Sequence, residues 1–69
     1  MEIVRPVIIA SPISGQPVAP RISERRYGPH IYREAVWTDP ASGAFIRKGI
    51  VQILDATTGE DVTHKVVSA

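Results

Sequence analysis

The sequence predicts an all-β fold, a small three-stranded antiparallel meander with a long, extended, proline-rich N-terminal arm. Five of the six prolines lie within residues 1–29. Residues 30–67 contain three strand-like segments separated by two turn sequences. No segment has a convincing helical period, and residues 22–26 have room for one helical turn at most. The chain therefore divides into an extended arm, residues 1–29, and a small β-meander domain, residues 30–69.

The arm is stiffened by its prolines, because each fixes its own φ, removes a backbone donor and pushes the preceding residue towards extended conformations. Residues 3–10 are compatible with a short edge strand in which Pro6 turns away from its neighbour. Residues 11–17 are typical of turns, and residues 18–22 are extended again. Eight of the first 22 residues are Ile or Val. That content argues against the alternative of a disordered tail, since such tails are poor in these residues.

The first meander strand is expected over residues 30–38, and its alternation defines two faces. One face carries Ile31, Arg33, Ala35 and Trp37, and the other carries Tyr32, Glu34, Val36 and Thr38. Both faces are partly apolar, as expected if each meets a neighbour.

The remaining elements follow from turn chemistry. Residues 39–43 read Asp-Pro-Ala-Ser-Gly, which predicts a type I turn that closes into a left-handed glycine. The second strand is expected over residues 44–54, where Gly49 indicates a bulge. A turn over residues 55–60 leads to a third strand over residues 61–67.

The small size of the chain limits its own core. A chain of 69 residues buries only about 60% of the surface that it exposes when unfolded, so its stability alone is marginal. There is no cysteine, which excludes disulfides and thiolate metal sites. Burial against a partner is the remaining common source of stability. We expect the arm to lie against another molecule, although folding back on an edge of its own sheet stays open.

Catalytic and metal chemistry are not expected. Residues 55–61 begin and end with acids, but Thr57 and Gly59 stand where a calcium loop needs Asp or Asn. His30 and His64 lack a fixed third ligand for a metal. The serines fall in expected loops and in no recognised nucleophile setting: Ser11, Ser14, Ser23 and Ser42. We therefore expect no enzyme activity, no metal and no cofactor.

A basic cluster stands at the junction of arm and sheet, consisting of Arg21, Arg25, Arg26 and Arg33 with Tyr27 and Tyr32 nearby. It is compatible with nucleic-acid binding, with a solvated joint, or with a protein interface, where Arg and Tyr are enriched. The net charge of +1 argues against a dedicated nucleic-acid binder. The candidate partner-binding residues are Ile3, Val7, Ile9, Ile13, Val18, Arg25, Arg26, Tyr27, Tyr32 and Trp37.

The N-terminal residues do not predict export or membrane insertion. Glu2 is acidic, and Arg5 with Pro6 interrupts the apolar run. The unbroken stretch over residues 7–10 is too short for a signal peptide or for a membrane span. A soluble, non-secreted, cytoplasmic protein is the default expectation.

The proline-rich arm over residues 1–29, the hairpin around residues 37–43, the near-neutral charge and the lack of cysteine together resemble small virion proteins of tailed bacteriophages, of the capsid-decorating or cement type. The resemblance implies a structural protein on the capsid surface that binds the major capsid protein or other virion subunits, often as a dimer or trimer. Two alternatives remain: a small nucleic-acid-binding β protein centred on residues 21–33, and a phage tail or head–tail connector component.

Overall fold

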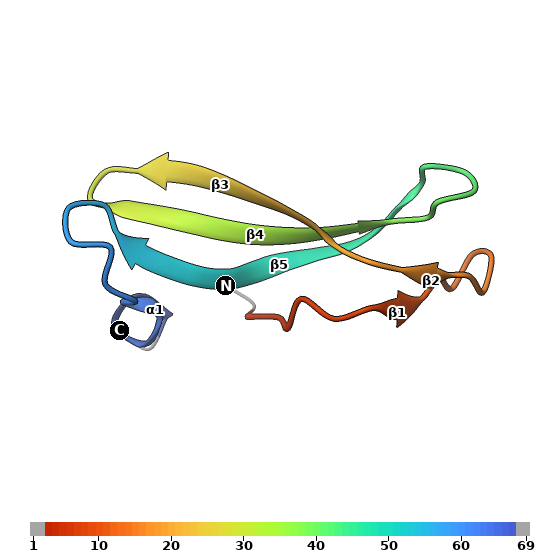
Figure 1. Cartoon of the computed structure of the whole chain (residues 1–69), viewed down its shortest axis with the longest axis horizontal. Coiled ribbons are helices and arrows are strands. Elements are labelled where there is room, and N and C mark those ends of the chain that lie inside the picture. The colour runs from red at the N-terminus through yellow and green to blue at the C-terminus, as the bar shows by residue number, and fades with distance from the viewer. Residues whose placement is uncertain (1–2, 68–69) are drawn as a thin grey trace.

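The computed structural model describes residues 3–67 and confirms the all-β class (Figure 1). Three long strands, β3 (Arg21–Tyr27), β4 (His30–Thr38) and β5 (Phe45–Asp55), form an antiparallel meander in the order β3-β4-β5. A second, two-stranded sheet pairs β1 (Ile9–Ala10) with β2 (Pro17–Val18). One short helix, α1 (Thr63–Val67), follows β5 in the described part of the chain.

The strands that form the meander differ from those expected. The prediction of a strand over residues 61–67 is wrong, because most of this segment is α1. Asp61 explains the difference: its carboxylate accepts hydrogen bonds from the backbone N–H and the hydroxyl of Thr63, at 2.9 and 2.6 Å. Such local bonds offer the backbone an alternative to strand pairing and favour a helix start.

The third strand of the meander is instead β3. Residues 22–26, where the sequence left room for one helical turn at most, instead pair with β4 in unbroken register. A two-residue turn joins Tyr27 to His30, and its Gly28 has a φ of 55°. The predicted boundary between residues 29 and 30 therefore falls inside the β3–β4 hairpin. We call residues 3–20, which precede the meander, the leading segment.

A turn forms over residues 39–43 and Gly43 has the predicted left-handed conformation, with a φ of 75°. Its N–H bonds to the carbonyl of Asp39 at 2.7 Å, so the turn is closed over four residues rather than over the three of a type I turn. The predicted bulge in the second strand falls elsewhere. Gly49 pairs regularly with Ala35, and the register shifts at two other places. One shift lies between Arg33 and Glu34 of β4 and leaves Val51 as the extra residue, and the other lies between Trp37 and Thr38 and leaves Ile46.

The leading segment folds back onto the meander of its own chain. The N–H of Val4 donates to the carbonyl of Ile50 at 2.9 Å, and the indole N–H of Trp37 donates to the carbonyl of Val7 at 2.9 Å. The main core cluster joins Val4 and Val18 of this segment to Ala35 and Trp37 of β4. Of the two arrangements that the sequence left open, the structure has the fold-back onto the sheet.

Gly49 permits the close approach of the leading segment. A Cβ at this position would lie 2.4 Å from Cγ1 and 3.2 Å from Cβ of Val4. Because a valine side chain is stiff and branched at Cβ, it cannot simply swing aside. Gly49 is therefore explained by contact rather than by a bulge.

Replacing Gly49 with alanine should lower the free energy of unfolding by roughly 1–3 kcal/mol, because the added methyl overpacks the contact with Val4. Denaturant unfolding measures this change. In a double-mutant cycle, Val4→Ala should cost less in the Gly49→Ala background than in the wild type, since it removes both clashing γ-carbons. Strictly additive effects of the two substitutions would show that the residues do not meet.

Candidate functional site

The two edges of the meander differ in their exposure. Along β5, the outer edge is covered by the chain itself: the N–H of Val4 bonds to the carbonyl of Ile50, and that of Val62 to the carbonyl of Ile53, each at 2.9 Å. Thr63 adds a side-chain contact to the N–H of Ile53 at 2.9 Å. By contrast, β3 pairs only with β4, and all seven of its residues are exposed. The outer edge of β3 therefore offers unpaired backbone groups at alternate residues.

A groove lies next to this open edge on one face of the meander. Its volume is about 390 Å³, and its lining residues come from all three long strands: Ser23, Arg25, Tyr27, Tyr32, Glu34 and Ile50. We call it the open groove. The pairing register produces it, because Arg25 faces Tyr32 and Ser23 faces Glu34, so these side chains share one face.

Aromatic rings form one end of the open groove. Tyr27 and Tyr32 meet edge to face with their ring centroids 5.8 Å apart, and His30 meets Tyr32 in the same manner at 6.3 Å. Tyr27 remains 58% exposed despite this contact. Rings that are held in place yet exposed lose little conformational entropy when a partner covers them, which suits them to binding.

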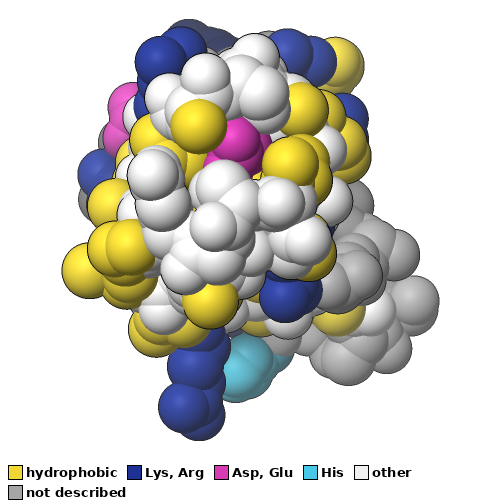
Figure 2. All heavy atoms as spheres, turned by 90° about the vertical axis from the view of Figure 1, so that its right-hand side faces the viewer, with side chains coloured by type: hydrophobic (Ala, Val, Ile, Leu, Met, Phe, Trp, Pro, Cys, Tyr) yellow, Lys and Arg dark blue, Asp and Glu magenta, His cyan; other side chains and the backbone are white. Residues whose placement is uncertain are grey.

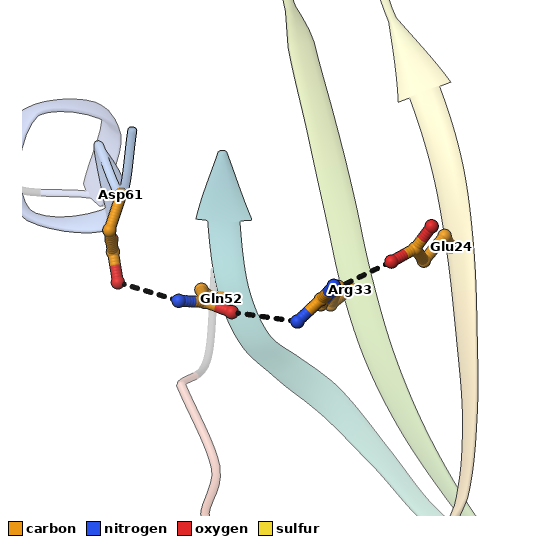
Figure 3. Close-up of polar contacts among 4 residues, drawn as sticks. All are labelled: Glu24, Arg33, Gln52 and Asp61. Carbon is orange, nitrogen blue, oxygen red and sulfur yellow. Dashed lines mark hydrogen bonds and ion pairs between the residues drawn. The ribbon is translucent and has the colours of Figure 1, made fainter. Parts of the chain in front are cut away.

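The acidic and basic side chains of β3 differ in their interactions within the chain. Glu24 forms an ion pair with Arg33 at 2.7 Å on the face opposite the open groove (Figure 3). Arg33 also donates a hydrogen bond to the side chain of Gln52, which in turn donates one to Asp61. A hydrogen bond with the Tyr27 side chain raises the pKa of Arg25 above its ordinary value, and charge interactions with Tyr27 and Glu34 add to the shift. The only acid of β3 is thus engaged, whereas the strand carries three exposed arginines, Arg21, Arg25 and Arg26.

The structure distributes the predicted partner-binding residues over three settings. Arg25, Tyr27 and Tyr32 line the open groove, and Arg26 is exposed on the same strand. The exposed apolar residues lie on the leading segment: Ile3, Val7 and Ile13, at 43, 51 and 55% exposure.

The other three predicted residues lie in or against the core of their own chain. Val18 and Trp37 are 4% and 1% exposed in the core, and Ile9 packs against that core. Val18 and Trp37 are thus buried within their own chain, whereas Ile9 is partly buried. An apolar side chain in a single sequence has the same appearance whether it packs within its chain or against another.

Sequence reasoning missed three residues of the open groove, Ser23, Glu34 and Ile50. The signal that could have found them is the Gly28–Pro29 pair, because a two-residue turn there aligns residues 21–27 with β4 and places Ser23 beside Glu34. The predicted arm ends at Pro29, so residues 21–27 were not expected to pair with β4.

At the other end of the meander, Asp39 connects the leading segment to the β4–β5 loop. Its carboxylate accepts hydrogen bonds from the hydroxyls of Ser11, Ser14 and Ser42 at 2.7, 2.6 and 2.9 Å, and from the backbone N–H of Ser42 at 3.0 Å. Asp39 is only 1% exposed. Figure 2 looks onto this end, where an acidic patch lies near the middle among hydrophobic side chains and atoms drawn in white, and most Lys and Arg lie towards the rim.

The hydrogen bonds of the Asp39 cluster tie the leading segment to the β4–β5 loop. The hydroxyls of Ser11, Ser14 and Ser42 all donate to the carboxylate, and none of them donates to a histidine. His30 begins β4 whereas Asp39 follows its end, so the length of the strand separates them. Within residues 3–67, no three His, Cys, Asp or Glu side chains gather in a way that could hold a metal ion.

No protein-family model, curated protein or solved structure matches this chain. Among the described residues, no helix has the length and apolar character needed to cross a membrane.

The hydrogen bonds to Asp39 predict a dependence of stability on pH. Bonds from Ser14 and Ser11 lower the pKa of Asp39 from 3.8 to about 2. A carboxylate with a depressed pKa stabilises the fold above its unfolded pKa, and this contribution is lost as the pH falls through the folded value. The melting temperature should therefore decline between about pH 4 and about pH 2.

Replacing Asp39 with asparagine should lower the melting temperature at neutral pH by several degrees and flatten this acid decline. Asp61→Asn is the matched control at the opposite end, because hydrogen bonds from Thr63 and Gln52 lower the pKa of Asp61 to about 2 as well. Each variant should remove only its own part of the decline. A wild-type melting temperature and acid profile in Asp39→Asn would contradict the role assigned to Asp39.

Proposed function

We propose that this chain is a non-enzymatic structural protein that binds and reinforces a larger protein assembly through the open groove and the β3 edge. The observation that carries this proposal is the contrast between the two edges, one covered by the chain itself and the other exposed at all seven residues. Proteins usually blunt an open edge with charged side chains, proline, a bulge or a covering segment, and of these β3 has only its charged side chains. β3 contains no proline, and its register with β4 is unbroken.

Strand addition explains why such an edge would be retained. An extended partner segment that pairs with β3 gains affinity from main-chain hydrogen bonds. Adjacent pockets that contact its side chains provide specificity. The open groove lies directly beside that edge and is lined by Arg25, Tyr27 and Tyr32. Arginine and tyrosine are the residue types that most often carry binding energy at protein interfaces.

The particular assembly that we propose is the head of a tailed bacteriophage, where the chain would act as a decoration or cement protein on the capsid surface. Its support is the resemblance in design described above, together with the exposed apolar residues of the leading segment, such as Ile8 at 68% and Ile13 at 55%. These residues would give a second contact with the major capsid protein or with another virion subunit, a further copy of this chain included. A tail or head–tail connector component would bind through the same surfaces, and only its location in the particle would differ.

Deleting the first 20 residues does not separate binding from folding, because the deletion removes Val4 and Val18 from the core. Single exposed residues are better probes. Tyr27→Ala should weaken co-sedimentation with phage heads roughly tenfold, since it removes a ring from the open groove. The circular dichroism and melting curve should stay close to those of the wild type.

Phe45→Ala is the matched control for this test, because Phe45 is a similarly exposed aromatic, at 60%, and starts β5 near the opposite end of the meander. It should bind the heads as the wild type does. Equal binding by the wild type and Tyr27→Ala would remove the open groove from the interface. No binding of the wild-type chain to heads or tails would contradict the proposed assembly.

Nucleic-acid binding is the second candidate, because Arg25, Tyr27 and Tyr32 share one exposed face on which bases could stack. Glu34 lies in the same groove and disfavours phosphates. If this candidate holds, affinity for single-stranded DNA or RNA should fall steeply between low and physiological salt. A flat salt response, or no binding in a filter or anisotropy assay, excludes it.

A further inference from the structure

The open edge of β3 has a specific charge pattern. Arg21 and Arg25 lie on the same face as Ser23 and Tyr27, because successive residues of a strand alternate between faces. Arg26 lies on the other face, where its Nε donates to the carbonyl of Gly28 at 3.3 Å. Glu24 is already paired with Arg33 at 2.7 Å. A segment laid along β3 would therefore meet two cations on the groove face and no unengaged acid of β3.

We propose that the β3 edge binds an extended acidic segment of a partner protein, with two carboxylate side chains four residues apart that face Arg21 and Arg25. This inference rests on the proposed function and names the chemistry of the partner segment. The segment adds as a fourth strand to the meander. Its two carboxylates lie on the groove face, and neutral side chains occupy the remaining positions on both faces.

A second copy of the chain fits this edge poorly. Two β3 strands paired edge to edge would bring together three arginines from each copy. Neither copy has an unengaged acid on β3 to offset them, since each Glu24 is held by its own Arg33. Like charges on directly opposed residues destabilise a strand pair. Charge complementarity therefore selects a different, acidic strand.

A nucleic acid also fits less well than a peptide. The edge of β3 offers backbone N–H donors and C=O acceptors in turn. A peptide backbone satisfies both kinds of group, whereas phosphates only accept hydrogen bonds. Glu34 in the open groove adds a local negative charge that a phosphate backbone would have to approach. An acidic peptide can place its carboxylates at the arginines and neutral residues elsewhere.

The test uses the full chain and a capped synthetic peptide that spans the length of β3, with glutamate at two positions four residues apart, to face Arg21 and Arg25, and threonine at all others. We expect the peptide to shift and protect the amide resonances of residues 21–27 in NMR spectra, with intermolecular backbone contacts to β3. The same peptide with glutamine in place of glutamate should bind roughly tenfold more weakly. Raising the salt concentration should reduce this difference, because exposed charges are screened.

Charge reversal supplies matched variants of the protein. Arg25→Glu should weaken binding of the glutamate peptide roughly tenfold and should favour a peptide with lysine in place of glutamate. Lys65→Glu changes the net charge equally but lies on α1, away from β3, and should bind as the wild type does. Both residues are exposed, so the folded state should tolerate either substitution.

Four results would overturn the inference. These are equal affinity for the glutamate and glutamine peptides, peptide contacts outside β3, self-association of the free chain through residues 21–27, and preference for a single-stranded oligonucleotide over the acidic peptide. The same experiments distinguish a failure of this inference from a failure of the proposed function. If the chain binds phage heads while the acidic peptide does not bind β3, only the partner chemistry is wrong. If the peptide binds but no virion assembly does, the assembly is wrong.

Discussion

The packing of the leading segment onto β4 and β5 is the interaction on which the rest of the structure depends. A sheet of three strands is near the minimum for independent stability, and here Val4 and Val18 cover Ala35 and Trp37 on one face and form the main core cluster with them. Backbone and indole hydrogen bonds hold this cover in place, and Asp39 fastens its loop to the β4–β5 turn. The small chain thus supplies from its own N-terminal third the core that we expected from a partner.

That arrangement has a direct consequence for function, because it uses one face and one edge of the meander and leaves the others open. The leading segment covers the β5 edge near Ile50, and residues 61–63 cover it near Ile53 and Leu54. β3 receives no such cover and carries the arginines beside the open groove. The asymmetry of the fold, rather than any catalytic group, directs the functional proposal to β3.

Much of the fold could be predicted from the sequence, where the local signals are strong. Alternation along residues 30–38 placed Ala35 and Trp37 on one face, and the Asp-Pro-Ala-Ser-Gly sequence predicted the turn and its left-handed Gly43. β3 was missed because its exposed residues show no apolar alternation and because prolines flank it. Contacts between residues distant in sequence, such as Val4 with Gly49 or Ser11 with Asp39, leave no local signal. The arginine–tyrosine part of the open groove was predicted, but its Ser23, Glu34 and Ile50 depend on strand pairing.

Hydrogen exchange of the free, monomeric chain tests the central claim most directly. The reporters are the backbone N–H of Val4, which bonds to Ile50, and the indole N–H of Trp37, which bonds to Val7. If the leading segment completes the core, both should be protected to a degree similar to the amides of β4 and should lose protection together with them in denaturant. Rapid exchange of both groups in a chain whose β4 and β5 amides stay protected would contradict the account.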